Sequence, residues 1–542
     1  MRQSTRTILI SVFVLCTFAG IAYFWATAMV DSIYAFRSPI SDSPPAAIDS
    51  TGIPLTRRVV IVLVDALRLD TSENAEIMPT LQRLSTSGAS ATMHSQTPSF
   101  SAPGYSTLLT GAWPYLNDGP AFNLEYEDIP TFTQDQLFAA ASRAGLKTAV
   151  SGYYWFEKLI PPDQIAYSFY TSVEDRAADE DVVANALPWL DNPSIKLVLI
   201  HIDQVDYAGH YEGGPANAAW DEAAHRSDEL IGRIAGKLDF NQDTILIISD
   251  HGQIDSGGHG GHEPVVLTEP FVLHGAGVRP GQYPDMQMVD VSPTLSVLLG
   301  ISLPASAQGV PLFDMLEVTI PDQAAYQQQQ AELQGNLTTL YARSIDMPDV
   351  TSGPESISTL RQMRLGKERI ARAIIPLAFL LGMTFLFWTR RTRLAAILFA
   401  GVVFLLAFNL RYILLDGKSY SFSTIESPTS LIIYIAVTAG AALALASLVY
   451  LWITWRKEAD PAQTIQSMLW FIICLDCLLL IPPMIHAWWN GILPTWTLPD
   501  FGIYFSGLFF QIQILVVSIL GMLIAFLSGG IRRFTKKKVS SE

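Results

Sequence analysis

The chain has 542 residues, half of them hydrophobic and only 15% charged, and its formal net charge is −16. This composition is too apolar for a purely soluble protein, and the last third is nearly continuous hydrophobic sequence. The acidic balance argues against nucleic-acid binding as the main function, because a phosphate backbone needs a basic surface. It does not exclude a phosphoester substrate, since bound metal ions would reverse the local sign of charge.

The first hydrophobic segment, residues 8–30, follows Arg2 and Arg6. Its roughly 23 apolar residues are enough to cross a hydrocarbon core of about 30 Å. Residues 1–30 therefore form either an uncleaved membrane anchor or a signal peptide, for which Ala26-Thr-Ala28 would serve as the cleavage site. The length favours the anchor, because hydrophobic regions of signal peptides usually run about 7–15 residues. Residues 31–56, rich in Pro, Ser and Asp, are predicted to be a linker.

From residue 57 onward, strand-type and helix-type segments alternate. Continuous β-branched runs are typical of buried parallel strands. This repetition predicts an α/β domain over residues 57–318, with a mostly parallel sheet and helices on both faces. A helical connector over residues 319–372 is expected to follow it. The expected strands are 59–67, 146–154, 195–203 and 244–249, and the expected helices are 78–88, 181–190, 216–238, 288–301, 322–343 and 356–372.

Five more hydrophobic spans follow residue 372 and predict a helical membrane domain over residues 373–528, with a basic tail over residues 529–542. Basic clusters precede the first of the six spans, follow the last, and occupy every second loop between them. If all are cytoplasmic, both termini lie inside and the α/β domain lies outside the cytoplasm. The five spans are 373–388, 394–415, 431–455, 468–488 and 504–527, and the basic residues are Arg2, Arg6, Arg390, Arg391, Arg393, Arg456, Lys457, Arg532, Arg533 and Lys536–Lys538.

Arg411 and Asp476 are ionisable residues inside predicted spans. Such groups usually face the interior of a helix bundle and find a partner there. We expect both to face inward and to pair with each other. The alternative is that they line a polar route for a lipid headgroup.

Asp65 closes the first predicted strand, where a buried carboxylate is unfavourable unless a positive charge compensates it. A metal ion would supply that charge, and other potential ligands cluster further along the chain. Asp250 and His251 directly follow a strand, the position at which an open α/β sheet places its site. Mixed Asp and His ligands suit zinc or manganese. The clustered candidates are Asp206 with His210, Asp250 with His251, and His259 with His262 behind it.

Ser101 lies just before a Pro-Gly turn and an apolar helix, in the segment SFSAPGYSTLLTG. A hydroxyl at a helix N-terminus can be an ordinary N-cap. It can equally be a nucleophile, because the free amides there stabilise an attacked phosphoryl group. Serine is a weak nucleophile at neutral pH, and coordination to a divalent metal would activate it.

The motifs VLVDAL, S-x-P-G-Y-S-T-L-L-T-G, D-Y-A-G-H, S-D-H-G and G-G-H-G follow one another in the order found in the alkaline phosphatase superfamily. The chain is most similar to its type I phosphodiesterase/nucleotide pyrophosphatase branch and to the related glycosylphosphatidylinositol ethanolamine-phosphate transferases. MVDVSPTLSVLLGI followed by QGVPL resembles the closing segment of that superfamily. The resemblance covers residues 57–315 and does not extend to the membrane spans.

This resemblance implies an alkaline-phosphatase-like fold, a two-metal site and a phosphorylated Ser101 intermediate. Asn123, in AFNLEY, stands where the phosphodiesterase branch carries an Asn that binds a phosphate oxygen. One metal ion would be held by Asp65, Ser101, Asp250 and His251, and the other by Asp206, His210 and His259; both are expected to be Zn²⁺, with Mn²⁺ as the alternative.

The chain departs from the family pattern at several positions. Ser101 replaces the more frequent Thr, and Tyr105 stands where many members have His. His262 is the alternative to His259 as the third ligand of the second metal, and G-G-H-G favours His259. A sulfatase is disfavoured because its formylglycine arises from a Cys, and the soluble region has none.

Two classes of function are consistent with these observations. The first is a membrane-bound phosphodiesterase or phosphotransferase that acts outside the cytoplasm. Its multispan half favours a lipid or glycolipid phosphoester, as in phosphoethanolamine transfer, and hydrolysis of soluble nucleotides or phosphodiesters is the alternative. The second class is a non-catalytic membrane protein that senses or scaffolds through bound metal. The candidate nucleophile Ser101 is present together with all the expected metal ligands, and this combination favours the enzyme.

Overall fold

The computed structural model describes residues 2–49, 52–348, 356–425, 427–458 and 460–539. Contacts within the chain define two compact units. The sheet unit comprises Ile33–Arg364 with Thr495–Leu498, and the helical unit comprises Met1–Ser32, Leu365–Pro494 and Pro499–Glu542. Parts of the predicted linker (50–51), connector (349–355) and tail (540–542) lie outside the described residues.

The sheet unit is built on one mixed sheet with strand order β4-β3-β5-β1-β6-β7-β2-β8, and β9 pairs with β2. At its centre, β1 (Arg58–Val64) runs parallel to β5 (Ile195–Ile202) and to β6 (Asp243–Ile248). The prediction of a mostly parallel sheet is confirmed. The sequence did not indicate β7, which is antiparallel to both of its neighbours. The remaining strands are β2 (Ala89–His94), β3 (Lys147–Tyr153), β4 (Tyr167–Thr171), β7 (Thr268–Gly275), β8 (Gly281–Gln282) and β9 (Met286–Gln287).

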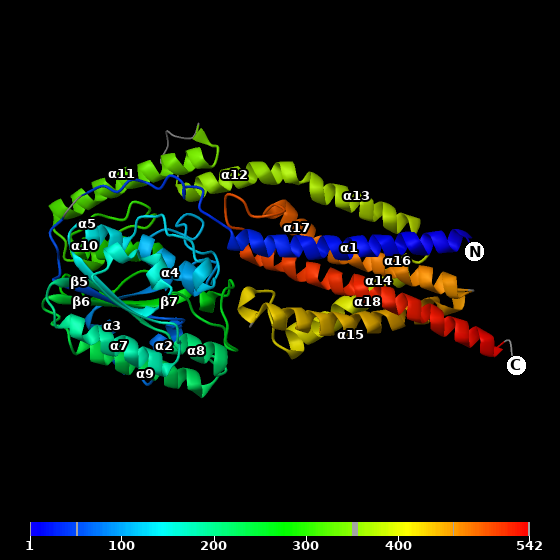
Figure 1. Ribbon diagram of the computed structural model, residues 1–542, viewed down its shortest axis with the longest axis horizontal. Coiled ribbons are helices and arrows are strands. Elements are labelled where there is room, and N and C mark those ends of the chain that lie inside the picture. The colour runs from blue at the N-terminus through cyan, green and yellow to red at the C-terminus, as the bar shows by residue number, and fades with distance from the viewer. Residues whose placement is uncertain (1, 50–51, 349–355, 426, 459, 540–542) are drawn as a thin grey trace. The chain divides into compact units, whose positions relative to one another are not determined.

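Helices cover both faces of this sheet (Figure 1). Val60, Val62 and Val64 of β1 pack into a core with side chains of the helices on one face, while all seven residues of β1 are buried. Burial on both faces explains why the strand is a continuous apolar run, and each buried Val contributes about 1.5–3 kcal/mol. The helices are α3 (Pro79–Ser87), α7 (Arg176–Leu190) and α9 (Ala218–Ala235) on that face, and α4 (Ser101–Thr110), α5 (Leu137–Arg143) and α10 (Val291–Leu299) on the other.

The segment predicted as a linker is partly packed against the sheet unit. The Arg37 guanidinium lies 2.5 Å from the carboxylate of Asp118, and the backbone N–H of Ser38 donates to the same carboxylate. The Gln329 side chain of α11 (Ile320–Ser344) donates to the carbonyl of Ile48. The Arg37 contact follows from burial, because the buried carboxylate of Asp118 needs the charge that Arg37 supplies.

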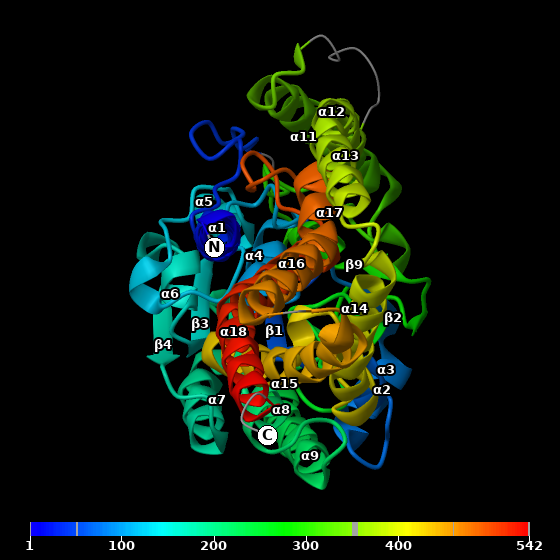
Figure 2. The same ribbon diagram turned by 90° about the vertical axis from the view of Figure 1, so that its right-hand side faces the viewer.

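The helical unit confirms the expectation of one N-terminal and five C-terminal apolar segments. Among the described residues, six helical stretches are long and apolar enough to cross a membrane, and Figure 2 views their bundle end-on. The span predicted at 468–488 consists of two helices that meet at Leu480. Pro482 and Pro483 follow closely, and each proline lacks the N–H that would continue the hydrogen bonding of the first helix. The helices are α1 (Arg2–Tyr34), α12 (Ile357–Arg372), α13 (Ile374–Thr389), α14 (Leu394–Asn409), α15 (Pro428–Thr454), α16 (Pro461–Leu479), α17 (Ile481–Trp489) and α18 (Phe501–Val539).

Arg411 and Asp476 do not pair, which corrects the expectation from the sequence. Arg411 lies in a π-helical turn, Leu410–Leu415, and its guanidinium is 3.4 Å from the carboxylate of Asp416. Its side chain is 43% exposed, so it does not face the bundle interior. Asp476 is buried in α16 and accepts a hydrogen bond from the Ser518 hydroxyl at 2.7 Å. Which side chains meet depends on how each helix is rotated, and the hydropathy of a span does not specify that rotation.

Candidate active site

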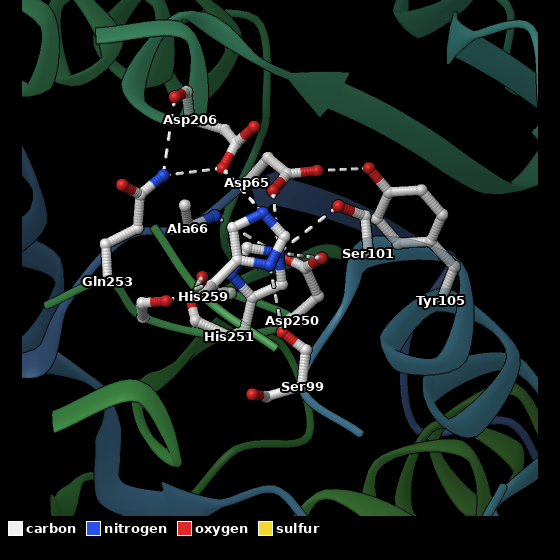
Figure 3. Close-up of polar contacts among 12 residues, drawn as sticks. Asp65, Ala66, Ser99, Ser101, Tyr105, Asp206, Asp250, His251, Gln253 and His259 are labelled. Atoms are coloured by element: carbon white, nitrogen blue, oxygen red, sulfur yellow. Dashed lines mark hydrogen bonds and ion pairs between the residues drawn. The ribbon is translucent and has the colours of Figure 1, made fainter. Parts of the chain in front are cut away.

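Four loops or helix starts at one end of the sheet bring the predicted residues together (Figure 3). Asp65 and Asp250 each stand just after a central strand, so their side chains leave the sheet at the same edge. Ala66, at φ 62°, turns the chain sharply after Asp65, and its N–H donates to Asp250 Oδ1 at 3.3 Å. This bond joins the two loops and holds the two carboxylates side by side.

Ser101 is the first residue of α4 and is 5% exposed. Its Oγ lies 3.2 Å from Nε2 of His251, and the N-cap residue of α4 is Phe100 rather than Ser101, which disfavours the N-cap interpretation. The geometry brings Ser101 to the Asp65 and Asp250 edge because Gly104, one turn along, packs directly on Asp250: a Cβ at Gly104 would come within 2.8 Å of Asp250 Cβ. Glycine there permits the close approach of α4 to the β6 loop.

Asp206 and His210 lie one turn apart on α8 (Gln204–Tyr211), with His210 Nε2 3.4 Å from Asp206 Oδ2. His259 joins them: its Nε2 is 2.9 Å from His210 Nε2 and 3.6 Å from Asp206 Oδ1. Gln253 donates to Asp206 Oδ1 at 2.6 Å and orients that carboxylate. His262 is exposed and belongs to none of the potential metal clusters found among the described residues.

The two buried imidazoles present the same nitrogen to the site. His251 Nδ1 is 3.1 Å from the carbonyl of Gly252, and His259 Nδ1 is 3.0 Å from the carbonyl of Ser99. A carbonyl partner assigns the proton to Nδ1 and leaves the Nε2 lone pair free, as in many metal-ligating histidines. The rings stack with centroids 4.0 Å apart. Burial lowers the pKa of His251 to about 4 and that of His259 to about 3, so both are neutral at physiological pH.

The surroundings of the site shift the pKa values of Asp250 and Asp206 in opposite directions. Burial, followed by repulsion from Asp65, raises the pKa of Asp250 well above its ordinary value. For Asp206 burial acts in the same direction, but the nearby imidazoles of His210, His259 and His251 outweigh it and hold its pKa below the ordinary value. Asp65 Oδ1 and Asp250 Oδ2 are buried and have no hydrogen-bond partner among the described residues. Buried oxygens of this kind need a charge or a donor, and a divalent ion would satisfy both.

These side chains could hold metal ions. Within the described residues, three groups of side chains have ligand atoms close enough to share an ion: Asp206 with His210 and His259, Asp65 with Asp206 and His251, and Asp65 with His201 and Asp203. The donor set, neutral imidazole nitrogens with carboxylate oxygens, fits a borderline divalent metal. The structure thus brings together the predicted ligands Asp65, Ser101, Asp206, His210, Asp250, His251 and His259.

Asn123 lies at the N-terminus of α4, beside Ser101. Its Oδ1 accepts the backbone N–H of Ala102 at 3.1 Å, and the residue is exposed. Because the carbonyl oxygen is held by Ala102, the amide Nδ2 is left to donate to a group outside the helix. This arrangement is compatible with the phosphate-binding role that the resemblance implies.

Several residues at the site were missed as functional candidates. Gln253 orients Asp206, while His201 lies in β5 with its Nε2 3.1 Å from Asp65 Oδ2. Tyr105, noted in the sequence only as a departure from the family pattern, donates to Asp65 Oδ2. The one sequence signal for His201 was a histidine inside an otherwise apolar strand run, IKLVLIHI. Burial, with repulsion from Asp206 and Asp65, raises the pKa of Glu174.

Comparison with known proteins places this geometry in context. A family model described as type I phosphodiesterase / nucleotide pyrophosphatase matches residues 59–352. The catalytic subunit of GPI ethanolamine phosphate transferase 2 from Homo sapiens is 26% identical over 309 residues, covering 52% of this chain and 31% of the relative. GPI ethanolamine phosphate transferase 2 from Yarrowia lipolytica is 28% identical over 301 residues, covering 50% of this chain and 34% of that relative. The chain therefore matches about a third of the length of these relatives.

Among solved structures, murine ectonucleotide pyrophosphatase/phosphodiesterase 5 is 16% identical, with a TM-score of 0.38. The match covers 48% of this chain and 100% of that structure. A mutant alkaline phosphatase is 11% identical, also with a TM-score of 0.38, and covers 49% and 100%.

Proposed function

Because the chain belongs to the type I phosphodiesterase/nucleotide pyrophosphatase family, we propose that it is a membrane-bound, two-metal enzyme that cleaves or transfers a phosphoester through a phosphorylated Ser101. The observation that carries this proposal is the position of Ser101 Oγ, 3.2 Å from His251 Nε2, beside two buried carboxylate oxygens that accept no hydrogen bond from the described residues. A structural serine has no need of such surroundings.

The residues present fit two divalent ions, zinc or manganese. When bound, the metals lower the charge on the attacking and leaving oxygens and favour the serine alkoxide. Asp65, Ser101, Asp250 and His251 would hold one ion, and Asp206, His210 and His259 the other.

The protein itself contributes orientation and donors. Ser101 presents Oγ from the first turn of α4, in which the N–H of Ala102 donates to Asn123 and the N–H of Gly104 donates to the carbonyl of Phe100. Asn123, fixed through Ala102, offers its Nδ2 to a non-bridging oxygen. Ser101 Oγ attacks phosphorus and forms a P–O bond while the bond to the leaving alcohol breaks, and water or an acceptor alcohol then releases the phosphoryl group from Ser101.

The substrate we propose is a lipid-linked phosphoester, with phosphoethanolamine as the transferred group. Its support is the combination of six apolar helices with similarity to GPI ethanolamine phosphate transferases. A single anchor would be enough to tether a hydrolase of soluble substrates. We place the sheet unit outside the cytoplasm with both termini inside, because this orientation puts four basic clusters on the cytoplasmic side, at residues 2–6, 390–393, 456–457 and 532–538. Hydrolysis of soluble nucleotides or phosphodiesters is the second candidate, favoured by the description of the family.

The test uses purified full-length protein in detergent with zinc or manganese. Bis-p-nitrophenyl phosphate, p-nitrophenyl phosphate, a dinucleotide and phosphatidylethanolamine with a glycolipid acceptor are offered in parallel. Ser101→Ala should lose about 10³-fold or more of the rate. Ser106→Ala is the matched control, because Ser106 is buried in the same helix and its hydroxyl only donates to the carbonyl of Ala102.

Diester cleavage lost in Ser101→Ala and kept in Ser106→Ala supports the proposed chemistry. Phosphoryl transfer to the glycolipid alone, without hydrolysis of soluble diesters, supports the transferase. Turnover of the dinucleotide with no lipid reaction moves the assignment to the second candidate. Full activity in Ser101→Ala contradicts the proposal, and so does well-folded protein that binds no metal. Protein that binds metal and turns over none of the substrates favours the sensing or scaffolding role.

A further inference from the structure

The two carboxylate oxygens of Asp65 have different surroundings (Figure 3). Oδ2 accepts a hydrogen bond from the hydroxyl of Tyr105 and lies 3.1 Å from His201 Nε2. Oδ1 is buried, has no hydrogen-bond partner among the described residues, and lies 3.4 Å from His251 Nε2. One oxygen is therefore bound by the protein, and the other points toward the candidate metal ligands.

The fold supplies Tyr105 and His201 from two separate elements. Tyr105 follows Ser101 by four residues on α4, so both side chains lie on the same side of that helix. His201 pairs with Leu63 across the β1–β5 ladder, and Leu63 precedes Asp65 by two residues. Residues two apart on a strand point to the same face, so His201 and Asp65 approach Tyr105 together.

Both rings are held tightly in place. Tyr105 and His201 are each 1% exposed. The Tyr105 ring stacks on Phe156 at 4.6 Å, and the imidazole of His201 packs edge-on against Tyr105 and Phe156. On its other side, a Cβ at Gly152 of β3 would lie 2.5 Å from His201 Cβ, so only glycine leaves room for this imidazole. Such packing restricts the rotamers and fixes where both polar groups point.

One arrangement of protons satisfies the three groups. The Tyr105 hydroxyl has a single hydrogen, which it donates to Asp65 Oδ2. Its oxygen then accepts from His201 Nε2, 2.8 Å away, which assigns the Nε2-protonated tautomer to His201. Asp65 Oδ2 thus accepts the hydroxyl hydrogen of Tyr105 and lies 3.1 Å from the same His201 Nε2, so the remaining capacity of this carboxylate as a ligand lies at Oδ1.

We propose that Tyr105 and His201 are positioning residues that commit Asp65 Oδ2 to the protein and direct Asp65 Oδ1 to the metal shared with Ser101. The inference rests on the proposed function, since it concerns how that site holds its metal. Partners of this kind, which orient a ligand without touching the metal, commonly govern affinity as strongly as a ligand does.

A competing interpretation is a third cation site. Asp65, His201 and Asp203 have ligand atoms close enough to share an ion. The hydroxyl of Tyr105, however, already bonds Asp65 and His201. A cation between Asp65 and His201 would have to displace this phenol from a fully packed position, so we favour the hydrogen-bonded arrangement. The experiment below distinguishes that arrangement from a cation site.

The test measures metal binding without turnover. Purified full-length protein in detergent is stripped with a chelator and titrated with zinc, with site affinities read by competition with a chromogenic chelator and stoichiometry read by elemental analysis. Tyr105→Phe removes the hydroxyl and keeps the ring on Phe156, and His201→Gln is the second variant. Tyr341→Phe is the matched control, because Tyr341 is a buried tyrosine of α11 whose hydroxyl makes no hydrogen bond within the described part of the chain.

We expect two zinc ions per wild-type chain. In Tyr105→Phe and His201→Gln, one of them should bind about 10–100-fold more weakly, with the other unchanged. The value of kcat at limiting zinc should fall by a similar factor with little change in KM, and excess zinc should restore it. A purely structural role would weaken neither site selectively and would not respond to excess zinc.

Unchanged zinc affinities in both variants would overturn the inference. Three zinc ions per wild-type chain, with the third lost in His201→Gln, would also overturn it and would establish the cation site instead. A wild-type chain that binds neither zinc nor manganese would overturn it as well. The proposed function fails on a different observation, namely full activity in Ser101→Ala, while the zinc titration of Tyr105→Phe is read independently of any reaction.

Discussion

Gly104→Ala should damage catalysis while leaving the fold nearly intact. The added methyl would meet Asp250 Cβ at 2.8 Å and the Asp250 backbone oxygen at 3.0 Å. Carbon atoms in contact normally stay about 3.5–4.0 Å apart, so α4 and the β6 loop must separate by roughly 0.7 Å or more. Since Ser101 begins α4 and Asp250 is a candidate ligand, this separation acts on the reacting geometry itself.

Gly104→Ala has two opposing effects on the free energy of unfolding. Replacing a helical glycine with alanine gains about 1 kcal/mol, whereas overpacking costs about 1–3 kcal/mol, so the free energy of unfolding should fall by no more than about 2 kcal/mol. A misplacement of about 1 Å can cost about 10²-fold in rate. We therefore expect kcat/KM for bis-p-nitrophenyl phosphate to fall about 10²-fold.

The matched control is Gly335→Ala in α11, where a Cβ would meet no atom within 4 Å. It should keep full activity and gain up to about 1 kcal/mol of stability. Both variants are assayed in detergent for diester cleavage and for chemical denaturation. Activity of Gly104→Ala within threefold of wild type would refute the argument that close approach of α4 to Asp250 sets the site geometry.

Three further predictions concern other residues. Burial raises the pKa of Glu269 well above its ordinary value. The free energy of unfolding should therefore fall by up to about 1.4 kcal/mol per pH unit as the pH rises from about 4.3, the pKa in the unfolded chain, toward the raised pKa of the folded chain. Glu269→Gln should remove that slope in thermal melts recorded across pH, and an unchanged slope would contradict the assignment. Asn123→Ala should lower kcat/KM for a diester about 10²–10³-fold if its amide binds a phosphate oxygen, whereas wild-type kinetics would assign it to the loop alone. Asp243→Ala should lower the free energy of unfolding by about 3–5 kcal/mol in denaturant titrations, because it leaves the buried Arg58, 1% exposed, without its ion pair. Arg57→Ala, at a more exposed partner of the same carboxylate, should lower it by less than about 1 kcal/mol. Equal losses in the two variants would count against burial as the cause.

Much of the site was predictable because its residues follow regular local patterns. A continuous β-branched run predicts a strand buried on both faces, and the first polar residue after it, Asp65, must leave the sheet at its carboxyl edge. The same argument applied to Asp250 and His251. Hydropathy alone likewise located the apolar helices, since about 20 apolar residues suffice to span a hydrocarbon core.

Contacts between elements were not predictable in this way. The bond from Tyr105 to Asp65 depends on α4 lying over β1, and the approach of His201 depends on β5 being the neighbour of β1 in the sheet. Periodicity identifies a strand without identifying its neighbour. The same limit explains the wrong pairing of Arg411 with Asp476, while the break at Leu480 had a visible signal in the two prolines that follow it.

The amino-acid sequence alone identified which side chains are candidate metal ligands, which hydroxyl is the candidate nucleophile, and which segments are apolar enough for a membrane. These depend on residue type and on spacing within one element. The tertiary structure decided which oxygen of Asp65 is free, which imidazole nitrogen faces the site, and that His259 rather than His262 stands beside Asp206 and His210. Those outcomes depend on the packing of segments far apart in the chain, because only their contacts determine where each donor and acceptor points.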